Sequence, residues 1–474
     1  MGVLRDPVVE IGPDGGVRGK LALNARGTCD TKRPMFRKPA AVFVLFLFAS
    51  LLPPFAAGEA DEKESGTPRW VFSFAERIRQ ESSDNVASLD ESKDDSSSYM
   101  RMRTNLAVSW KPSETFAFGL RLANEMRYYL SPKTDPKLGV DFGLNEVVID
   151  QLYARWNHPA GLPLTLTVGR QDIQMGEGFV LMDGGPGDGS RTAYFNGARA
   201  DVSLDSGRTL TAFYVNQPRT DRFLPRLNDA GQIMVEQDEE SYGLYHSGGL
   251  GKAKFEAYLF RLNRERRGLF PGAGFQTAGG RVQVPLAGRL SLTAEGALQF
   301  GRREDDRKTG FGGYARLDYA TGEAGALPAT LTLGGIWLSG DDPSTAGKDE
   351  GWDPAFGRWP KWSDSLIYLL ARETRAAYWS NFTSLYGSLG FAPASNIKLN
   401  LAWHRLGAAE RTEPSNLWSG RGTRRGDLGI LKVVYEIGPH WQGHFLWEHF
   451  RPGGFYFPGA RGYAWIRFEL LIRY

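Results

Sequence analysis

The chain has almost no cysteine and no long apolar run, and each absence excludes a class of protein. Cys29 is the only cysteine among 474 residues, so a disulfide framework is excluded. The longest apolar run, residues 40–52, is shorter than the roughly 20 residues that a membrane-spanning helix needs. If this chain crosses a membrane, it must therefore cross it with strands.

The first 58 residues contain the pattern of a secretory signal. Met35 is followed by two basic residues, by the apolar run and by small residues at 56–58. We therefore expect an extension from a misplaced start codon over 1–34, a signal peptide over 35–58, a short lead over 59–69 and a folded domain over 70–474. A genuine cytoplasmic tail over 1–34 is the alternative. Cys29 precedes the signal, so the mature chain would contain no cysteine.

The chain also has little net charge. The formal charge is +3, from 57 Lys+Arg and 54 Asp+Glu, but residues 1–57 contain 8 basic and 4 acidic residues. From residue 58 onward 49 basic and 50 acidic residues remain, a net charge of −1. This balance excludes a basic nucleic-acid-binding protein, and we expect neither a nucleic-acid partner nor a cofactor.

What the chain does have is alternation with period two. From Ala464 to Tyr474 every second residue is apolar, and the residues between them include Arg467, Glu469 and Arg473. A strand with one apolar and one charged face is typical of a barrel that faces lipid outside and water inside. A closed barrel pairs its last strand with its first, so we expect this segment to lie beside the strand that begins at Trp70.

Similar segments recur between short turns and long polar loops. The sequence predicts an all-β protein, a transmembrane antiparallel barrel of 16–18 strands with short periplasmic turns and long extracellular loops. The eighteen candidate strands are 70–80, 99–110, 115–130, 146–157, 164–173, 194–204, 208–216, 239–247, 252–263, 275–286, 290–300, 310–320, 328–339, 375–391, 397–406, 425–436, 440–450 and 461–474. Ser363–Thr374, with Ser363 as N-cap, is either an amphipathic helix or an extended arm of a loop.

Two blocks of sequence resemble the alginate-export family of outer-membrane barrels. The signature residues are Gly169, Arg170, Gln171, Gly176, Gly178, Arg191 and Arg199 in the first block, and Gly340, Asp341, Asp353 and Pro354 in the second. The resemblance covers most of 70–474. It implies a barrel that passes anionic polysaccharide or other solutes, and periplasmic export components as possible partners.

Parity places a group of arginines on one inner sector of the barrel. The residues expected to line the lumen there are Arg77, Arg79, Arg101, Arg103, Arg121, Glu125, Arg127, Arg467, Glu469 and Arg473. Such a sector would concentrate anions, and arginine forks suit carboxylates. The alternative is an ordinary charged wall, cross-paired with acidic residues elsewhere such as Glu295 and Glu436.

Three other features carry less information. The carboxylates Asp341, Asp342, Asp349, Glu350 and Asp353 could form a Ca²⁺ site, but a solvated acidic loop is favoured and no metal is predicted. The glycine cluster 184–189 lacks the Lys-Ser/Thr ending of a phosphate loop, so a flexible loop is expected. Arg170 has the parity of the lipid face; either its strand has left the hydrocarbon there or a bulge turns it inward.

These observations predict an outer-membrane channel and no enzyme. The leading hypothesis is passage of an anionic polysaccharide or sugar acid by diffusion through an arginine-lined lumen in the outer membrane of a Gram-negative bacterium. The alternative within the same fold is a general or small-solute uptake porin. A barrel enzyme lacks a recognisable nucleophile and base, and an adhesive or structural barrel would need a plugged lumen.

Overall fold

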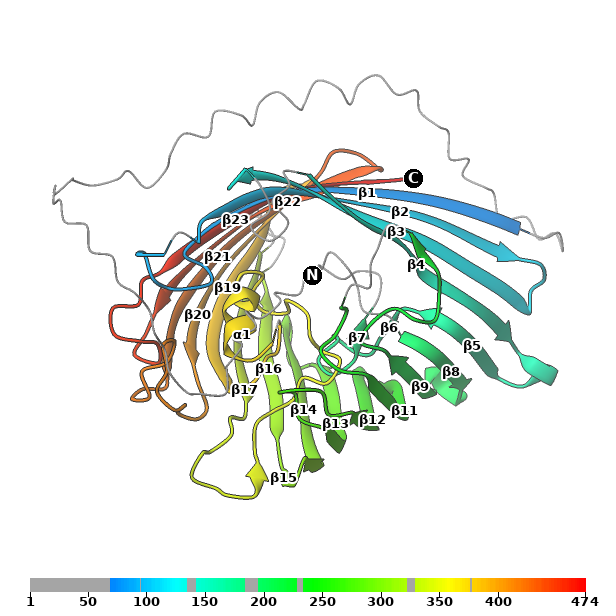
Figure 1. Ribbon diagram of the computed structural model, residues 1–474. Helices are drawn as coiled ribbons and strands as arrows, with labels where there is room; N and C mark the ends of the chain where they lie inside the picture. Colours follow the sequence, from blue (N-terminus) through cyan, green and yellow to red (C-terminus); the bar gives the residue numbers. More distant parts are fainter. Residues whose placement is uncertain are drawn as a thin grey trace. The chain divides into compact units, whose positions relative to one another are not determined.

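Alternating strands form one antiparallel sheet that closes on itself (Figure 1). The computed structural model describes residues 69–93, 95–133, 142–183, 195–227, 233–321, 329–375 and 377–474. The extension and signal predicted over 1–34 and 35–58, and all of the 59–69 lead except its last residue, lie outside these residues and stay predictions. No helix in the described ranges is long and apolar enough to cross a membrane.

Eighteen strands of the described chain make the barrel wall, as the sequence predicts. They are β1 (Arg69–Asp84), β2 (Ser97–Lys111), β3 (Phe116–Ser131), β4 (Phe142–Asn157), β5 (Leu164–Gln171), β8 (Phe195–Ser203), β9 (Thr209–Gln217), β11 (Glu239–Leu250), β12 (Ala253–Arg264), β13 (Ala273–Pro285), β14 (Leu290–Arg303), β16 (Phe311–Ala320), β17 (Ala329–Leu338), β19 (Phe382–Ala394), β20 (Ile397–Gly407), β21 (Arg424–Glu436), β22 (Trp441–Pro452) and β23 (Tyr463–Arg473).

Short elements occupy the connections. They are β6 (Ile173–Gln174), β7 (Met182–Asp183), β10 (Arg226–Leu227), β15 (Asp306–Lys308), β18 (Lys348–Asp349), the helix α1 (Leu366–Glu373) and the 3₁₀ turns Pro159–Gly161 and Asp205–Gly207. The helix alternative for 363–374 is therefore confirmed. Ser365 is its N-cap residue, and the hydroxyl of the predicted cap, Ser363, accepts the backbone N–H of Leu366 at 3.0 Å.

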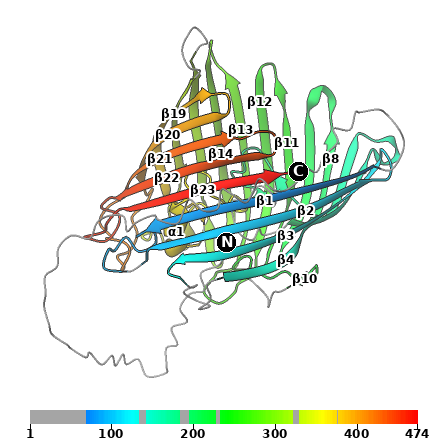
Figure 2. The ribbon, with the colours of Figure 1, turned by 90° about the horizontal axis from the view of Figure 1, so that it is seen from above.

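The last strand closes the barrel against the first. β23 pairs antiparallel with β1, so that Arg79 lies opposite Glu469, while on its other side Arg79 lies opposite Arg101 of β2. Figure 2 shows β23, β1, β2, β3 and β4 side by side. The pairing predicted from the last segment is therefore confirmed.

The two faces of the wall differ as the alternation predicts. Trp70, Phe72 and Phe468 point outward and are 56%, 71% and 47% exposed, whereas the inward Arg79 and Arg467 are only 4% and 2% exposed. Apolar side chains on the outer face meet lipid at no cost, and charges there would cost roughly 2–4 kcal/mol each at the midplane. The physics of the bilayer thus explains the period-two pattern.

Three predicted strand boundaries are wrong by four residues or more. β1 continues to Asp84 rather than ending at residue 80, β4 begins at Phe142 rather than at residue 146, and β19 begins at Phe382 rather than at residue 375. In the last case the predicted start belongs to a connection inside the barrel, where Tyr378 and Trp379 are buried. Aromatic residues in that connection resemble strand residues because they too pack against an apolar surface.

Two connections fold into the ring rather than away from it. We call residues 171–183, with β6 and β7, the first inward segment, and residues 339–381, with β18 and α1, the second inward segment. Figure 1 shows β6, β7 and α1 inside the circle of strands. Most of the buried apolar cluster of the protein lies where these segments meet each other and the inner wall.

The two inward segments are joined by backbone and aromatic contacts. Phe356 donates its N–H to the carbonyl of Val180 at 3.0 Å, and the rings of Phe179 and Trp352 stack with centroids 5.2 Å apart. Gly357 is required at this junction, because a Cβ there would lie 2.0 Å from the carbonyl oxygen of Phe179. The junction therefore fixes both segments inside the lumen.

Candidate conduction pathway

The register of five neighbouring strands gathers most of the predicted arginines. We call this surface, the inner face of β23, β1, β2, β3 and β4, the arginine wall. Arg101 lies opposite Arg79 on one side and opposite Arg127 on the other, and Arg103 lies opposite both Arg77 and Glu125. The arginines that the structure brings together are Arg77, Arg79, Arg101, Arg103, Arg121, Arg127 and Arg467. Arg473 belongs to the same strand as Arg467 but is exposed.

One carboxylate, Glu81, connects three of these arginines. Its Oε1 lies 3.0 Å from Nη1 of Arg101, 3.1 Å from Nε of Arg467 and 4.0 Å from Nη1 of Arg79. Glu81 is not among the predicted lumen residues, because it lies one residue beyond the predicted end of the first strand at residue 80. Parity alone could have found it, since Glu81 follows Arg77 and Arg79 on the same face.

Other carboxylates of the wall pair with the remaining arginines. Glu125 lies 3.5 Å from Arg101 and 3.3 Å from Arg127, and Glu469 is bonded to Arg79. Asp150 is bonded to Arg121 and lies 3.7 Å from Arg103. Asp150 lies where the pairing of β3 with β4 shifts register. The alternation of the sequence therefore does not predict its contact with Arg121.

The arginine sector is therefore cross-paired, as the ordinary-wall alternative expects, but with different partners. Glu295 accepts hydrogen bonds from tyrosines of another wall, and Glu436 contacts the exposed Lys398 at 3.3 Å. The arginines still outnumber the carboxylates that the five strands themselves supply. The surface is thus a positively charged ladder held in place by a smaller number of buried acids.

Each inward segment adds one carboxylate to the arginine wall. Asp172 of the first segment accepts two hydrogen bonds from Arg121, at 3.0 and 3.1 Å. Asp364 of the second segment accepts one from Arg467 at 2.7 Å. Sequence reasoning missed both, because the predicted strand 164–173 includes Asp172 although β5 ends at Gln171, and because Asp364 lies in a connection without periodicity.

The opposite side of the lumen has a different chemistry. We call the inner face of β11, β12, β13, β14 and β16 the tyrosine wall, because Tyr245, Tyr258 and Tyr314 lie there. Tyr258 and Tyr314 donate their hydroxyls to Glu295 at 3.1 and 2.9 Å. Two of its cations, Arg281 and Arg316, contact Glu256 and Asp318 at 3.1 and 3.0 Å.

Glu177, from the first inward segment, contacts the tyrosine wall. It lies 3.0 Å from Arg281 and 2.7 Å from Arg316, and it also accepts the hydroxyl of Tyr314 at 2.9 Å. Burial opposes ionisation of this carboxyl, but the hydrogen bonds and charge of Arg316 prevail and lower its pKa to about 2. Glu177 is therefore a carboxylate at every physiological pH.

Lys361, from the second inward segment, lies beside the same cluster. Its ammonium group donates to the carbonyl of Glu177 at 3.0 Å and lies 4.9 Å from the ring centroid of Tyr314. Burial lowers the pKa of Lys361 to about 8, although Glu177 and Glu295 oppose that shift. It is thus a cation beside the tyrosine wall that can lose its proton near physiological pH.

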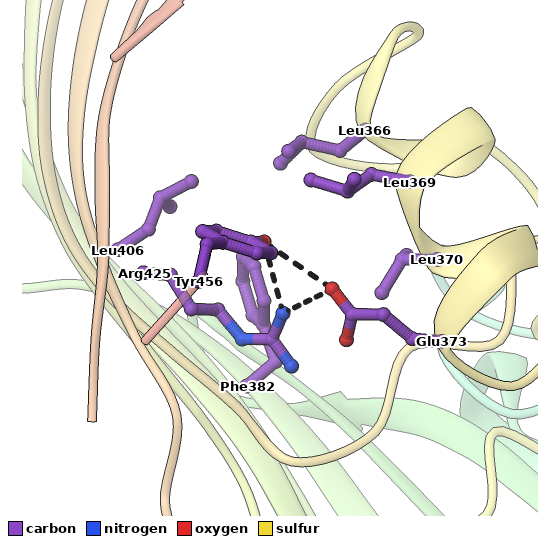
Figure 3. A pocket seen from close by; sticks show the side chains of 8 residues that line it. All are labelled: Leu366, Leu369, Leu370, Glu373, Phe382, Leu406, Arg425 and Tyr456. Atoms are coloured by element: carbon purple, nitrogen blue, oxygen red, sulfur yellow. Dashed lines mark hydrogen bonds and ion pairs between the residues drawn. The ribbon is translucent and has the colours of Figure 1, made fainter. Parts of the chain in front are cut away.

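Polar contacts at both ends of the helix α1 bind it to the wall beside a small cavity (Figure 3). Leu366, Leu369 and Leu370 point from the helix into this cavity, toward the wall residues. At the end of the helix Glu373 contacts Arg425 at 2.7 Å, and Tyr456 donates its hydroxyl to Glu373 at 3.2 Å. At the start of the helix, the N–H groups of residues 364 and 365 donate to Glu448 at 2.9 and 3.0 Å.

Most of the signature residues lie in or next to the inward segments, but they have structural partners. Gly169, Gln171, Gly176 and Gly178 lead into or lie within the first segment, and Gly340, Asp341 and Pro354 belong to the second. Asp353 is bonded to Arg264 and Tyr378, and Arg199 contacts Asp201 at 2.9 Å. Arg191 and the glycine cluster 184–189 lie outside the described residues.

The acidic loop does not converge on one point. Asp349 contacts Lys308 and Arg303 at 2.8 and 2.7 Å, and Asp353 is occupied by Arg264. Asp341 accepts the N–H of Glu350, and Asp342 accepts that of Ser344, both at 2.9 Å. Within the described ranges no group of three or more His, Cys, Asp or Glu side chains is arranged for a metal ion.

Arg170 is covered by a connection that parity could not foresee. It is 2% exposed and contacts Asp221 at 2.7 Å and the carbonyl of Ile149 at 2.7 Å. The pairing of β5 with β4 and β8 runs through Arg170 without a register shift, which argues against a bulge. Asp221 belongs to the β9–β11 connection, whose β10 pairs with β4 and fills the place that β5 leaves.

Comparisons with known proteins identify the fold. No family model matches this sequence, and no curated protein matches it. Among solved structures, the outer membrane protein opdK from Pseudomonas aeruginosa has a TM-score of 0.55, 11% identity and coverage of 86% of this chain and 98% of its own. OpdK with vanillate, from the same organism, has a TM-score of 0.54, 11% identity and coverage of 85% of this chain and 98% of its own. OccK2 (OpdF) of P. aeruginosa in complex with glucuronate has a TM-score of 0.53, 12% identity and coverage of 85% and 97%.

At 11–12% identity the similarity to these structures concerns the fold alone. The chain is a closed, antiparallel, eighteen-stranded barrel of the outer-membrane type, and this architecture with its apolar outer face belongs to the outer membrane of a Gram-negative bacterium. The expectation that the chain is no enzyme is consistent with such barrels. The resemblance to the alginate-export family stays a prediction.

Proposed function

We propose that this protein is an outer-membrane channel for small solutes that carry a carboxylate, such as a sugar acid. The observation that carries the proposal is the arginine wall: its guanidinium groups form a continuous ladder along one side of the lumen. Arginine binds carboxylates through paired N–H groups, and a lumen with one-sided charge concentrates anions. Two similar barrels are described with vanillate and with glucuronate, and both compounds are carboxylates.

The inward segments favour a small solute over a polysaccharide. They place a packed cluster inside the lumen, in which Trp352 and Phe356 are 1% and 2% exposed. A polymer in transit would have to keep a wide passage open along its whole length. The small-solute porin that the sequence analysis gave as its alternative therefore fits this interior better than an exporter of anionic polysaccharide.

Reversal potentials across a planar bilayer test the anion preference. We expect the purified barrel to favour chloride over potassium, and replacement of Arg101, Arg103, Arg121 and Arg467 by Gln to abolish that preference. Since these side chains are mostly buried, the half-buried Arg127→Gln serves as a milder variant, and heat-dependent mobility in gels reports folding. Lys398→Gln, in an exposed pair, is the matched control and should change nothing.

Liposome swelling tests the size of the solute. Glucuronate should enter rapidly, and uronate oligomers should enter more slowly with each added unit. Equal rates for long oligomers would favour the polysaccharide hypothesis. A barrel that is cation-selective, or that keeps its selectivity when the arginines are replaced, would rule out the proposed function.

A further inference from the structure

The two carboxylates that reach the arginine wall from the inward segments hold the positions that a solute carboxylate would take. Asp172 faces Arg121 end-on, with one oxygen on each terminal nitrogen, at 3.0 and 3.1 Å. This is the fork geometry in which arginine binds a free carboxylate. Asp364 likewise lies 2.7 Å from Nη1 of Arg467.

Each of these arginines also has a partner that belongs to the wall. Nε of Arg121 is bonded to Asp150, and Nε of Arg467 donates to Glu81 at 3.1 Å. The wall carboxylates thus fix the guanidinium groups from one edge, while the loop carboxylates occupy another edge. If a loop carboxylate left, the arginine would keep its place and its charge.

The two kinds of carboxylate differ sharply in exposure. The side chains of Asp172 and Asp364 are 26% and 20% exposed, whereas those of Asp150 and Glu81 are each 1% exposed. A partly exposed carboxylate can turn to water when it leaves its arginine, so its desolvation does not oppose the exchange. A buried carboxylate such as Asp150 or Glu81 cannot reach water when it leaves its arginine.

We propose that Arg121 and Arg467 are two carboxylate-binding sites that the protein fills with its own Asp172 and Asp364, and that a permeating carboxylate exchanges with them. This inference rests on the proposed function, and it adds how the protein regulates the strength of solute binding. The exchange replaces one set of N–H···O bonds by an equivalent set. The internal carboxylates act as tethered competitors, whose effective concentration for short tethers is in the millimolar range. They therefore weaken solute binding and keep the solute moving.

Removal of a tethered competitor should tighten solute binding. We expect Asp172→Asn and Asp364→Asn each to lower the apparent dissociation constant for glucuronate, measured from its block of single-channel current, by about tenfold. Asp172→Glu keeps the carboxylate and should bind glucuronate like the wild type. Heat-dependent gel mobility reports folding, and either Asn variant suffices if the other does not fold.

Asp201→Asn is the matched control. Asp201 contacts Arg199 at 2.9 Å and is 20% exposed, like Asp364, but it belongs to the wall itself, where Thr211 of the neighbouring strand donates to it at 2.6 Å and holds it in place. The substitution removes the same charge without removing a competitor, so the affinity of the channel for glucuronate should change little. Equal tightening in all three Asn variants, or none in Asp172→Asn and Asp364→Asn, would overturn the exchange. A wild-type channel that glucuronate neither enters nor blocks would instead refute the proposed function.

Discussion

The arginine wall and the tyrosine wall face each other across one lumen, and one buried carboxylate on each wall has opposite surroundings. On the arginine wall Glu81, which is 1% exposed, is surrounded by Arg79, Arg101 and Arg467. On the tyrosine wall Glu295, which is 5% exposed, accepts hydrogen bonds from two neutral hydroxyls. The first carboxylate neutralises charge, and the second only completes hydrogen bonds.

The difference between the two walls indicates which residues produce the positive electrostatic potential of the lumen. Strands alone leave an excess of arginine on one wall, and the opposite wall carries its arginines beside carboxylates of its own. The inward segments then add Asp172 and Asp364 to the arginine wall and Glu177 and Lys361 to the tyrosine wall. The proposed selectivity therefore depends on both the wall and the loops that fold onto it.

The largest expected effect separates the two buried carboxylates. Glu81→Gln leaves arginines without their shared counter-charge and should lower the free energy of unfolding by about 3 kcal/mol. Glu295→Gln keeps an acceptor oxygen for one tyrosine and offers an N–H donor to the hydroxyl oxygen of the other, and it should cost about 1 kcal/mol or less. Urea unfolding in lipid vesicles, followed by tryptophan fluorescence, measures both. Equal losses would mean that the two walls do not differ in this respect.

A smaller effect is expected at the junction that holds the loops against both walls. Gly357→Ala places a methyl group against the carbonyl of Phe179 and should cost about 1–3 kcal/mol by overpacking. Because the inward segments would then be less firmly joined, single-channel records should show more frequent conductance steps. Gly429→Ala, where no atom lies within 4 Å of the added Cβ, is the control. A quiet Gly357→Ala channel would contradict the role given to the junction.

The smallest effect concerns pH and distinguishes the walls by their cations. Arginine stays protonated throughout, whereas the pKa of Lys361 is lowered to about 8. Raising the pH from 7 to 9 should therefore weaken anion selectivity slightly, because Lys361 loses its charge. Loss of that proton also removes the cost of burying a charged lysine, so the free energy of unfolding should rise between pH 8 and the ordinary lysine pKa near 10.5. Reversal potentials at pH 7 and 9 test the selectivity, and urea unfolding across pH 8–10.5 tests the stability. Lys361→Met should show smaller changes in both, and Lys398→Met should behave like the wild type.

Much of the wall could be predicted because lipid imposes a rule on every strand. The outward Trp70 and Phe72 and the inward Arg77 and Arg79 follow from parity alone. Glu81 obeys the same parity and was missed only because the end of a strand carries a weak signal. Asp150 breaks the parity at a register shift, so its contact with Arg121 could not be read from spacing.

By itself the sequence determined the faces, the strand order and the closure of the barrel, because a bilayer allows only alternating strands without a free edge. Only the tertiary structure decided which carboxylate meets which arginine. Those contacts depend on the register between strands, on one shift in β4, and on two loops that have no period and fold back into the lumen. Asp172 and Asp364 lie far from Arg121 and Arg467 in the chain, and only the packing of the inward segments brings them together.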